Sequence, residues 1–432
     1  MRRTPMTPFL LAGAMLIAPT ATAAPGDKKI NAAIDRVAPE VIAIRHDIHE
    51  HPELSNREFR TSKLVADHLR SLGLEVTTNI AHTGVVGVLR GGKPGPVIAV
   101  RADMDALPVT EDTPFAFKST ERAVFLGQEV GVAHACGHDI HTSVQLGVVE
   151  ALASMRDDLP GVIKFIFQPA EEGPPRGEDG GAEMMLREGV FDSPRPQVIF
   201  ALHSTPDLEV GQVGYTIGPA FAAVDHFYIE VHGVQSHGSA PEKGIDPIVA
   251  ASQLVTALQT IRSRNLPARE PSVVTVGVFH GGTRFNIIPA TVHLEGTVRT
   301  YNPDVQDTIE RRMREIATGV TQAAGATFEM EYVRVTPPTI NDPDLARETI
   351  PSLKRAVGAD NVVEMEPVMG GEDFAYFSNE IPGFYFRLGT RRPGTTSGGL
   401  HTPTFTADDG SIVVGAKAMA TVLVDYLRRH AP

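Results

Sequence analysis

Cysteine is almost absent from this chain: of its 432 residues, only Cys136 carries a thiol. A single thiol has no partner for an internal disulfide, so a disulfide-stabilised scaffold is excluded. Ligation of a metal ion is the role that we expect for this single cysteine.

Long apolar runs are also missing, apart from one at the start of the chain. Arg2 and Arg3 precede an apolar run over residues 9–18 and small residues at 21–24, which is the pattern of a secretory signal peptide. That run is too short to span a bilayer, and no later stretch reaches about 18 uninterrupted apolar residues. We therefore expect a protein that is exported to the periplasm or secreted, is cleaved near Ala23 and has no membrane anchor.

Positive charge is in deficit. The chain has 39 Lys and Arg against 52 Asp and Glu, a net charge of -13, and loss of Arg2 and Arg3 with the signal peptide would make it -15. Such an acidic protein binds nucleic acid poorly, so no nucleic-acid partner is expected. Any anionic substrate must be held by local cations or by a metal.

The chain is long enough for two domains, and hydrophobic residues make up 42% of it. Strands alternate with helices in residues 24–222 and again in 337–432, which predicts one discontinuous α/β domain with a doubly wound sheet covered on both faces. Residues 223–336 give the order β-α-β-β-α-β instead. That order is typical of a ferredoxin-like sandwich, which can be inserted into another domain.

Residues with metal-binding chemistry cluster where the strands of the first domain are expected to end, the usual place for a site in an open α/β sheet. Cys136 and His138 are two positions apart, so in an extended segment both side chains would face the same way and could bind a common metal pair. The alternative is a small buried thiol beside histidines that serve local hydrogen bonds.

Two adjacent carboxylates, Glu171 and Glu172, follow an apolar strand predicted over residues 162–167. One can ligate a dication while the other takes a proton from the attacking water and later delivers it to a leaving nitrogen. A solvated acidic loop is the alternative, but the apolar strand favours a buried strand end. His203, after another strand, and His401, in a glycine-rich loop, would complete five ligands suited to two ions of zinc type.

Six short motifs follow one another in order along nearly the whole mature chain. Together they resemble the aminoacylase/carboxypeptidase-type dinuclear metallopeptidases, and most of all the amidohydrolase branch with hippurate hydrolase, N-acyl-amino-acid amidohydrolases and auxin-conjugate hydrolases. The motifs are residues 101–108, 134–141, 168–172, 286–289 with 296–299, 371–374 and 400–403.

The resemblance implies two divalent metal ions, with zinc expected first and manganese, cobalt or nickel as alternatives. It also implies that the inserted domain is a lid that forms a homodimer or higher homo-oligomer. By position, Glu171 matches the general acid/base. The matching metal ligands are Cys136, His138, Glu172, His203 and His401.

Further positions follow from the resemblance. His237 and Asn286 match residues of the lid that bind substrate and stabilise the oxyanion, in some relatives from the partner subunit. Asp103 matches an acidic position near the metals and is expected to orient a ligand or its loop, and Glu372 is expected to support the pocket wall. Arg284, by contrast, departs from the family's pattern, in which small or neutral residues are more usual at this position; it is a candidate for binding a substrate carboxylate, with a surface arginine on a turn as the competing interpretation.

The predicted function is metal-dependent hydrolysis of the amide bond of N-acyl amino acids, such as hippurate-like compounds, with Glu171 as general acid/base. An exported carboxypeptidase or dipeptidase acting on short peptides is the alternative among enzymes. A non-catalytic metal-dependent binding protein for acyl amino acids is the alternative from another class. Glu171 argues against this binder, because binding alone needs no proton shuttle beside a ligand carboxylate.

Overall fold

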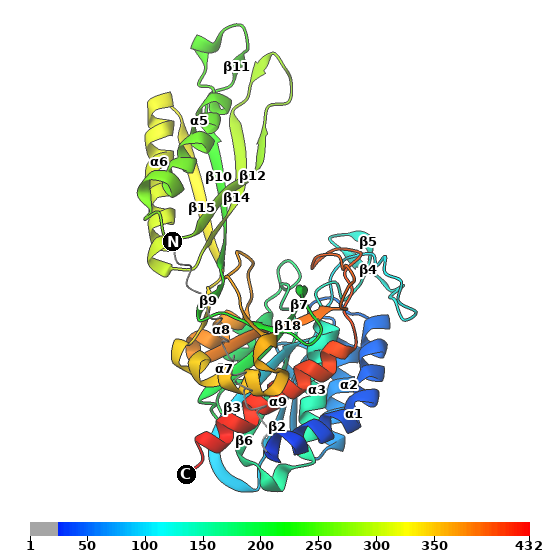
Figure 1. The fold of residues 1–432 in the computed structure, drawn as a ribbon. Helices are drawn as coiled ribbons and strands as arrows, with labels where there is room; N and C mark the ends of the chain where they lie inside the picture. The colour runs from blue at the N-terminus through cyan, green and yellow to red at the C-terminus, as the bar shows by residue number, and fades with distance from the viewer. Residues whose placement is uncertain (1–24) are drawn as a thin grey trace, which may run out of the picture.

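The computed structural model describes residues 25–432, and the predicted signal peptide, residues 1–23, lies outside the described residues. Figure 1 shows two parts: a larger domain at the bottom and an inserted domain that rises from it. The larger domain comprises residues 25–222 and 337–432, and the inserted domain begins with a strand at Ala223 and ends with one at Thr336.

An eight-stranded sheet forms the centre of the larger domain, in the order β1-β2-β6-β3-β7-β18-β8-β17. The middle strands β6, β3, β7 and β18 are parallel, while β2 and β8 run antiparallel to their inner neighbours. The strands are β1 (Glu75–Ile80), β2 (Gly84–Arg90), β3 (Lys93–Asp103), β6 (Pro160–Gln168), β7 (Val198–Glu209), β8 (Val213–Tyr215), β17 (Val362–Glu364) and β18 (Gly383–Arg391).

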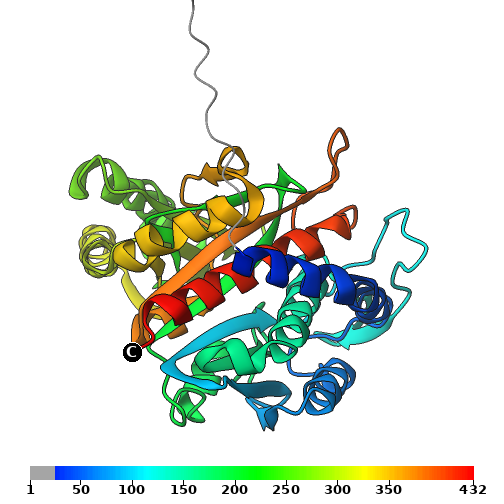
Figure 2. The same ribbon diagram turned by 60° about the horizontal axis from the view of Figure 1, so that its bottom comes forward.

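Helices cover both faces of this sheet, because its middle strands are apolar on both sides. One face packs against α1, α2, α3, α7 and α9, and the other against α4 and α8. Figure 2 shows α1, α7 and α9 in blue, yellow-orange and red across the first face. The helices are α1 (Pro25–Glu50), α2 (Phe59–Ser71), α3 (His138–Ala153), α4 (Gly181–Arg187), α7 (Pro343–Val357), α8 (Phe374–Glu380) and α9 (Gly410–Arg429).

One helix of the described residues, α9, is long and apolar enough to cross a membrane. Within its most apolar window, however, 72% is buried inside the protein. Its side chains, among them Met419 and Leu423, belong to the same core as α1 and α3. The apolar character of α9 is therefore explained by its place in the core.

The inserted domain is an antiparallel sheet in the order β12-β14-β10-β15 with α5 and α6 on one face. Alternation along β10 sends Phe227, Ile229 and Val231 into this core. Asp246 and Asn302 cap the two helices, each followed by a proline at the first helical position. The elements are β10 (Ala223–His232), α5 (Pro247–Thr260), β12 (Ser272–Gly281), β14 (Thr291–Thr300), α6 (Pro303–Ala324) and β15 (Thr327–Thr336).

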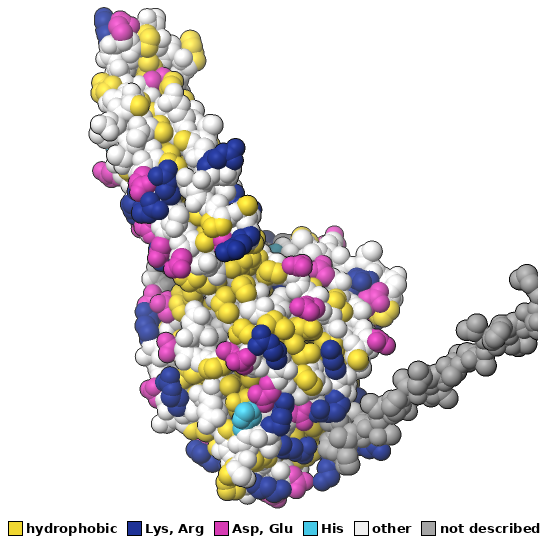
Figure 3. All heavy atoms as spheres, turned by 60° about the vertical axis from the view of Figure 1, so that its left-hand side comes forward, with side chains coloured by type: hydrophobic (Ala, Val, Ile, Leu, Met, Phe, Trp, Pro, Cys, Tyr) yellow, Lys and Arg dark blue, Asp and Glu magenta, His cyan; other side chains and the backbone are white. Residues whose placement is uncertain are grey.

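These observations confirm the predicted α/β fold with a ferredoxin-like insertion. Short elements were not predicted: α8, the hairpin β4 (Arg122–Phe125) with β5 (Gln128–Gly131), and the pairs β9 (Gly218–Phe221) with β16 (Thr339–Asn341) and β11 (Ser236–His237) with β13 (Ile287–Ile288). Acidic and basic side chains are interspersed on the face in Figure 3, without a continuous basic surface.

Candidate metal centre

The turn into α3 brings the cysteine motif to the sheet. Gly137 has a positive φ of 86°, and α3 begins directly after it with His138. The prediction that Cys136 and His138 share an extended segment was therefore wrong: the left-handed glycine turns the chain into a helix between them. A Cβ at Gly137 would lie 2.3 Å from Ser204 Oγ, so this close approach also requires glycine.

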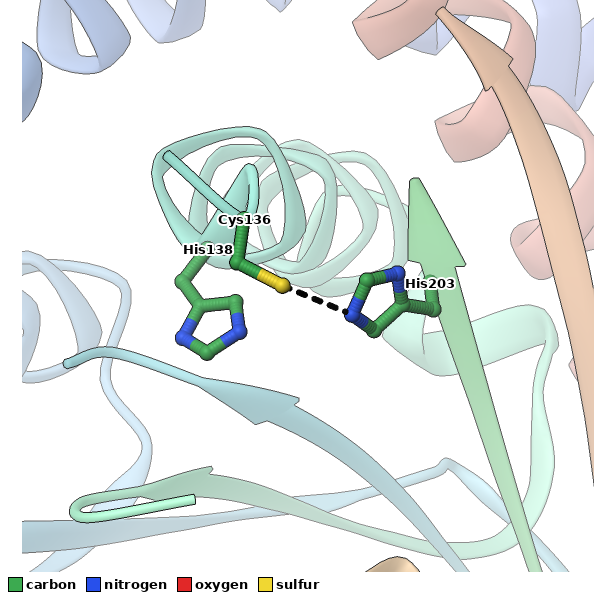
Figure 4. A group of neighbouring side chains, drawn as sticks. All are labelled: Cys136, His138 and His203. Carbon is green, nitrogen blue, oxygen red and sulfur yellow. Dashed lines mark hydrogen bonds between the residues drawn. The ribbon is translucent and has the colours of Figure 1, made fainter. Parts of the chain in front are cut away.

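Figure 4 shows Cys136, His138 and His203 gathered between the start of α3 and the strand β7. The Sγ atom of Cys136 lies 3.3 Å from Nε2 of His203. On the other side of its ring, His203 Nδ1 lies 2.6 Å from the carbonyl oxygen of Ser204 and can donate to it. That hydrogen bond leaves the lone pair of Nε2 directed at the sulfur, as a metal ligand requires.

The second contribution comes from the turn after β6. Ala170 has a positive φ of 53°, unusual for a residue with a side chain, and the next two residues are Glu171 and Glu172. Asp105 holds this turn, because its carboxylate accepts hydrogen bonds from the backbone nitrogens of both glutamates at 3.1 and 3.0 Å. The same carboxylate lies 3.2 Å from Nδ1 of His138.

The loop before α9 adds the last predicted ligand. His401 Nε2 lies 3.0 Å from Oε1 of Glu172, and these two side chains form a group with Cys136 whose ligand atoms are all within 4.8 Å of one another. Cys136, His138 and His203 form another such group. The structure thus brings all five predicted ligands together, with the sulfur common to both groups.

The unsatisfied atoms at this site fit a cation. His138 Nε2 is buried without a hydrogen-bond partner among the described residues, 3.8 Å from Oε2 of Glu171 and 4.0 Å from Oε1 of Glu172. A buried polar atom without a partner is costly, and imidazole, thiolate and carboxylate are the ligands that zinc-type ions prefer. The donor set therefore matches a pair of transition-metal ions.

Burial shapes the acid–base properties of the site. Burial first, and then the charges of Glu172 and Glu171, raise the pKa of Cys136 well above the ordinary range of a thiol. Burial and the charge of Glu372 likewise raise the pKa of Glu171 well above that of a free carboxyl. A thiolate here requires a nearby cation, and a raised pKa makes it easier for Glu171 to take up and hold a proton.

Behind the glutamates lies a buried network centred on Arg101. Its guanidinium donates to Asp103 at 2.7 Å, Glu372 at 3.0 Å, Asp373 at 2.9 Å and the amide oxygen of Gln168 at 2.8 Å. Glu372, expected to support the pocket wall, is thus fixed by the arginine at the end of β3.

The sequence predicted that Asp103 orients a metal ligand or its loop; in the structure, Asp103 and Asp105 share this role. Asp103 hydrogen bonds Nδ1 of His141 at 2.6 Å, and His141 Nε2 accepts a hydrogen bond from the backbone of Ser204. Asp105 is the carboxylate within hydrogen-bond distance of His138, and it also binds the backbone of the glutamate turn. Its spacing of two from Asp103, just after a strand, is the signal that could have revealed it.

The predicted lid residues lie elsewhere. His237, on β11, pairs with Ile287, and the backbone oxygen of Asn286 accepts a hydrogen bond from Gly238 at 2.9 Å. Figure 1 shows β11 at the tip of the inserted domain, away from the larger domain. Arg284 is exposed on the adjoining loop. The structure therefore joins His237 to Asn286 but separates both from the five predicted ligands of the same chain.

The α/β domain, its inserted sandwich and the two overlapping ligand groups define the class of two-domain metal-dependent hydrolases. The chain belongs to the peptidase family M20/M25/M40, whose family model matches residues 99–425.

Relatives of assigned activity are similar over most of their length. The chain is 40% identical to an N-acyl-L-amino acid amidohydrolase of Geobacillus stearothermophilus over 73% of this chain and 81% of that protein. It is 39% identical to thermostable carboxypeptidase 1 of Saccharolobus solfataricus over 92% of this chain and 98% of that protein. A dinuclear metal-binding peptidase of the M20 family from Bacillus subtilis has a similar structure, with a TM-score of 0.76, 34% identity and coverage of 91% and 99%.

Proposed function

We propose that this enzyme hydrolyses the amide bond of N-acyl amino acids. The observation that carries the proposal is a cavity of about 620 Å³ that borders Glu172 and is mainly apolar. Its apolar lining comes from four segments of the chain and includes Leu54, Leu107, Pro108, Val124, Phe125, Leu126 and Pro174. An acyl group of moderate size can fill such a space while its carbonyl carbon lies beside the ligand cluster.

The charges around this cavity disfavour a dipeptide as substrate. Arg57 and Arg176 are its cationic lining residues, and Glu172 is the one carboxylate among the described residues that line it. The free ammonium group of a dipeptide would meet apolar side chains and arginines, with Glu172 already directed at His401. An uncharged acyl group avoids the cost of an unpaired buried cation.

The residues then take the following roles. Cys136, His138, Glu172, His203 and His401 would hold two divalent ions, and this set of donors favours zinc. Ions bound there polarise the carbonyl group and lower the pKa of the attacking water. Glu171 accepts the proton of that water on its carboxylate and delivers it to the leaving nitrogen, while Asp105 keeps the glutamate turn in place.

Three further features belong to the proposal. We place His237 and Asn286 at the active site of a partner subunit in a homodimer, because both lie at the tip of the inserted domain. There they would stabilise the developing oxyanion. Cleavage near Ala23 would release the enzyme outside the cytoplasm.

A substrate panel tests the proposal. The metal-reconstituted protein should hydrolyse N-acetyl and N-benzoyl amino acids far faster than unblocked dipeptides or peptides with a free C-terminus. Faster cleavage of peptides would favour the carboxypeptidase alternative, the activity for which the relative from Saccharolobus solfataricus is named.

Glu171→Gln tests the proton shuttle. We expect turnover to fall by at least about 100-fold, with metal content measured by elemental analysis unchanged. Glu75→Gln, on the exposed strand β1, is the matched control and should leave both unchanged. Full activity in the Glu171 variant would refute the role, and absence of turnover in the unaltered protein with bound metal would favour a binding protein.

A further inference from the structure

Arg387 is a buried arginine without a salt-bridge partner among the described residues. It lies on β18 with 9% of its surface exposed, and it forms no hydrogen bond or ion pair with any described residue. Its Nη2 atom is among the buried nitrogens that lack a partner. The two most buried arginines, Arg45 and Arg101, are by contrast each paired with at least two carboxylates.

The presence or absence of paired carboxylates changes the pKa of these arginines. Burial lowers the pKa of Arg387 from its ordinary value. Burial acts on Arg101 in the same direction, but the charges of Glu372, Asp103 and Asp373 outweigh it and raise that pKa well above the ordinary value. At Arg387 the opposing charges, which include that of Asp207, do not outweigh burial, and no carboxylate of the described residues forms a salt bridge with it.

The position of Arg387 is next to the candidate metal centre. It is in register with His203 on the neighbouring parallel strand, so the two side chains leave the same face of the sheet from strands about 4.8 Å apart. Tyr385, two positions earlier on β18, has its ring centre 6.4 Å from that of His203. Arg387 thus lies on the strand next to the one that carries His203, one of the predicted ligands.

The guanidinium is also held in place. It lies 5.1 Å from the ring centre of Phe221, which packs edge-on against Tyr385. Phe221 is the last residue of β9, two positions before the inserted domain begins. Stacking on an aromatic ring fixes the plane of the guanidinium and leaves its edge for a planar bidentate partner.

We propose that Arg387 binds the carboxylate of the amino-acid half of the substrate. The inference rests on the proposed function, which supplies an anion of the right geometry at the right place. A carboxylate accepts two parallel hydrogen bonds from a guanidinium, and this pairing would give the buried Nη2 of Arg387 the partner that it lacks among the described residues. Arg284, the candidate from the sequence, is exposed at the tip of the inserted domain and has no such requirement for an anion.

The test compares N-benzoylglycine with N-benzoylglycinamide, which differ only in the carboxylate. The unaltered enzyme should favour the acid in kcat/KM. In Arg387→Met this preference should fall by about 10- to 100-fold, through a higher KM for the acid and an unchanged rate for the amide. Arg387→Lys, which keeps the charge but loses the fork, should be intermediate, and Arg284→Met should match the unaltered enzyme.

Stability separates a binding role from a structural one. Because Arg387→Met removes an unpaired buried charge, its melting temperature without ligand should be equal or higher. A lower melting temperature together with an unchanged preference for the acid would overturn the proposal. If Arg387→Met does not fold, an Arg387→Lys variant with the full preference for the acid would overturn it as well.

A binding measurement keeps this proposal distinct from the proposed function. Thermal shifts of Glu171→Gln with the acid and with the amide report binding without turnover. One outcome is that the acid raises the melting temperature of Glu171→Gln, that this effect is lost when Arg387→Met is added, and that the unaltered enzyme cleaves neither the acid nor the amide. In that case Arg387 binds the carboxylate as proposed, and the proposed function fails. If both compounds are cleaved and the preference is unaffected by Arg387→Met, the carboxylate role alone fails.

Discussion

Replacement of Arg101 by Met is the sharpest test of the buried network behind the glutamate turn. The arginine makes four hydrogen bonds of 2.7–3.0 Å, three of them to the carboxylates of Asp103, Glu372 and Asp373. Its own side chain and that of Asp103 are fully buried. Methionine fills much of the same volume but leaves three carboxylates without their cation.

We expect Arg101→Met to lower the free energy of unfolding by about 3–5 kcal/mol, the usual cost of removing one partner of a buried ion pair. Urea unfolding of the metal-reconstituted protein, followed by circular dichroism, measures this loss. The matched control is Arg90→Met, because Arg90 pairs with Glu75 on the surface, with half or more of both side chains exposed. That variant should cost less than about 1 kcal/mol.

The pH dependence adds a second check. Burial first, and then the charge of Glu372, raise the pKa of Asp373 to about 7, although Arg101 acts to lower it. Without Arg101 the carboxylates should hold protons more tightly, so the cost of the substitution should shrink as the pH falls from 8 to 5. A cost in Arg101→Met no greater than in Arg90→Met at pH 8 would refute the reasoning.

The remaining predictions concern the glycine turn, one buried glutamate and the metals. Gly137→Ala should reduce metal content and activity, because the new Cβ would lie 2.3 Å from Ser204 Oγ and the φ of 86° is unfavourable for alanine. The control Gly319→Ala, in an open helical position, should stabilise the protein by about 0.5–1 kcal/mol. Equal metal content in the two variants would contradict the role of Gly137. Burial and the charge of Asp105 raise the pKa of Glu58 from 4.5 to about 8, so its contribution to stability is present below pH 4.5 and lost as the pH rises through 8. Glu58→Gln should flatten the melting temperature over this range, and an unchanged slope would argue against it. Chelation should abolish activity and lower the melting temperature, with zinc restoring both; full activity after verified metal removal would exclude the metal centre.

Much of the fold could be predicted from the sequence, because the spacing of apolar residues and the positions of glycine and proline are local features. The apolar strands of the larger domain, the alternation along β10 and the capped helices of the inserted domain all agree with the elements expected from the sequence. The start of α3 was misjudged because a single glycine at positive φ decides whether the chain continues extended or turns into a helix. That choice depends on the close contact with Ser204, which only the folded chain provides.

The candidate site was readable in part for a different reason. Thiol, imidazole and carboxylate groups are typical metal ligands, so Cys136 and Glu172 could be proposed as ligands from the sequence. The structure adds that these two side chains lie close to His401.

The chemistry of individual side chains and the period of apolar residues were enough to determine the class of fold and the kind of reaction, and to predict a donor set. Tertiary structure alone decided that Asp105 holds the glutamate turn, that His237 lies at the tip of the inserted domain and that Arg387 is buried with no partner for its Nη2 among the described residues. The physical reason is that burial and pairing depend on neighbours distant in the chain. The amino-acid sequence gives the charge of an arginine, but only the folded structure shows whether a partner lies beside it.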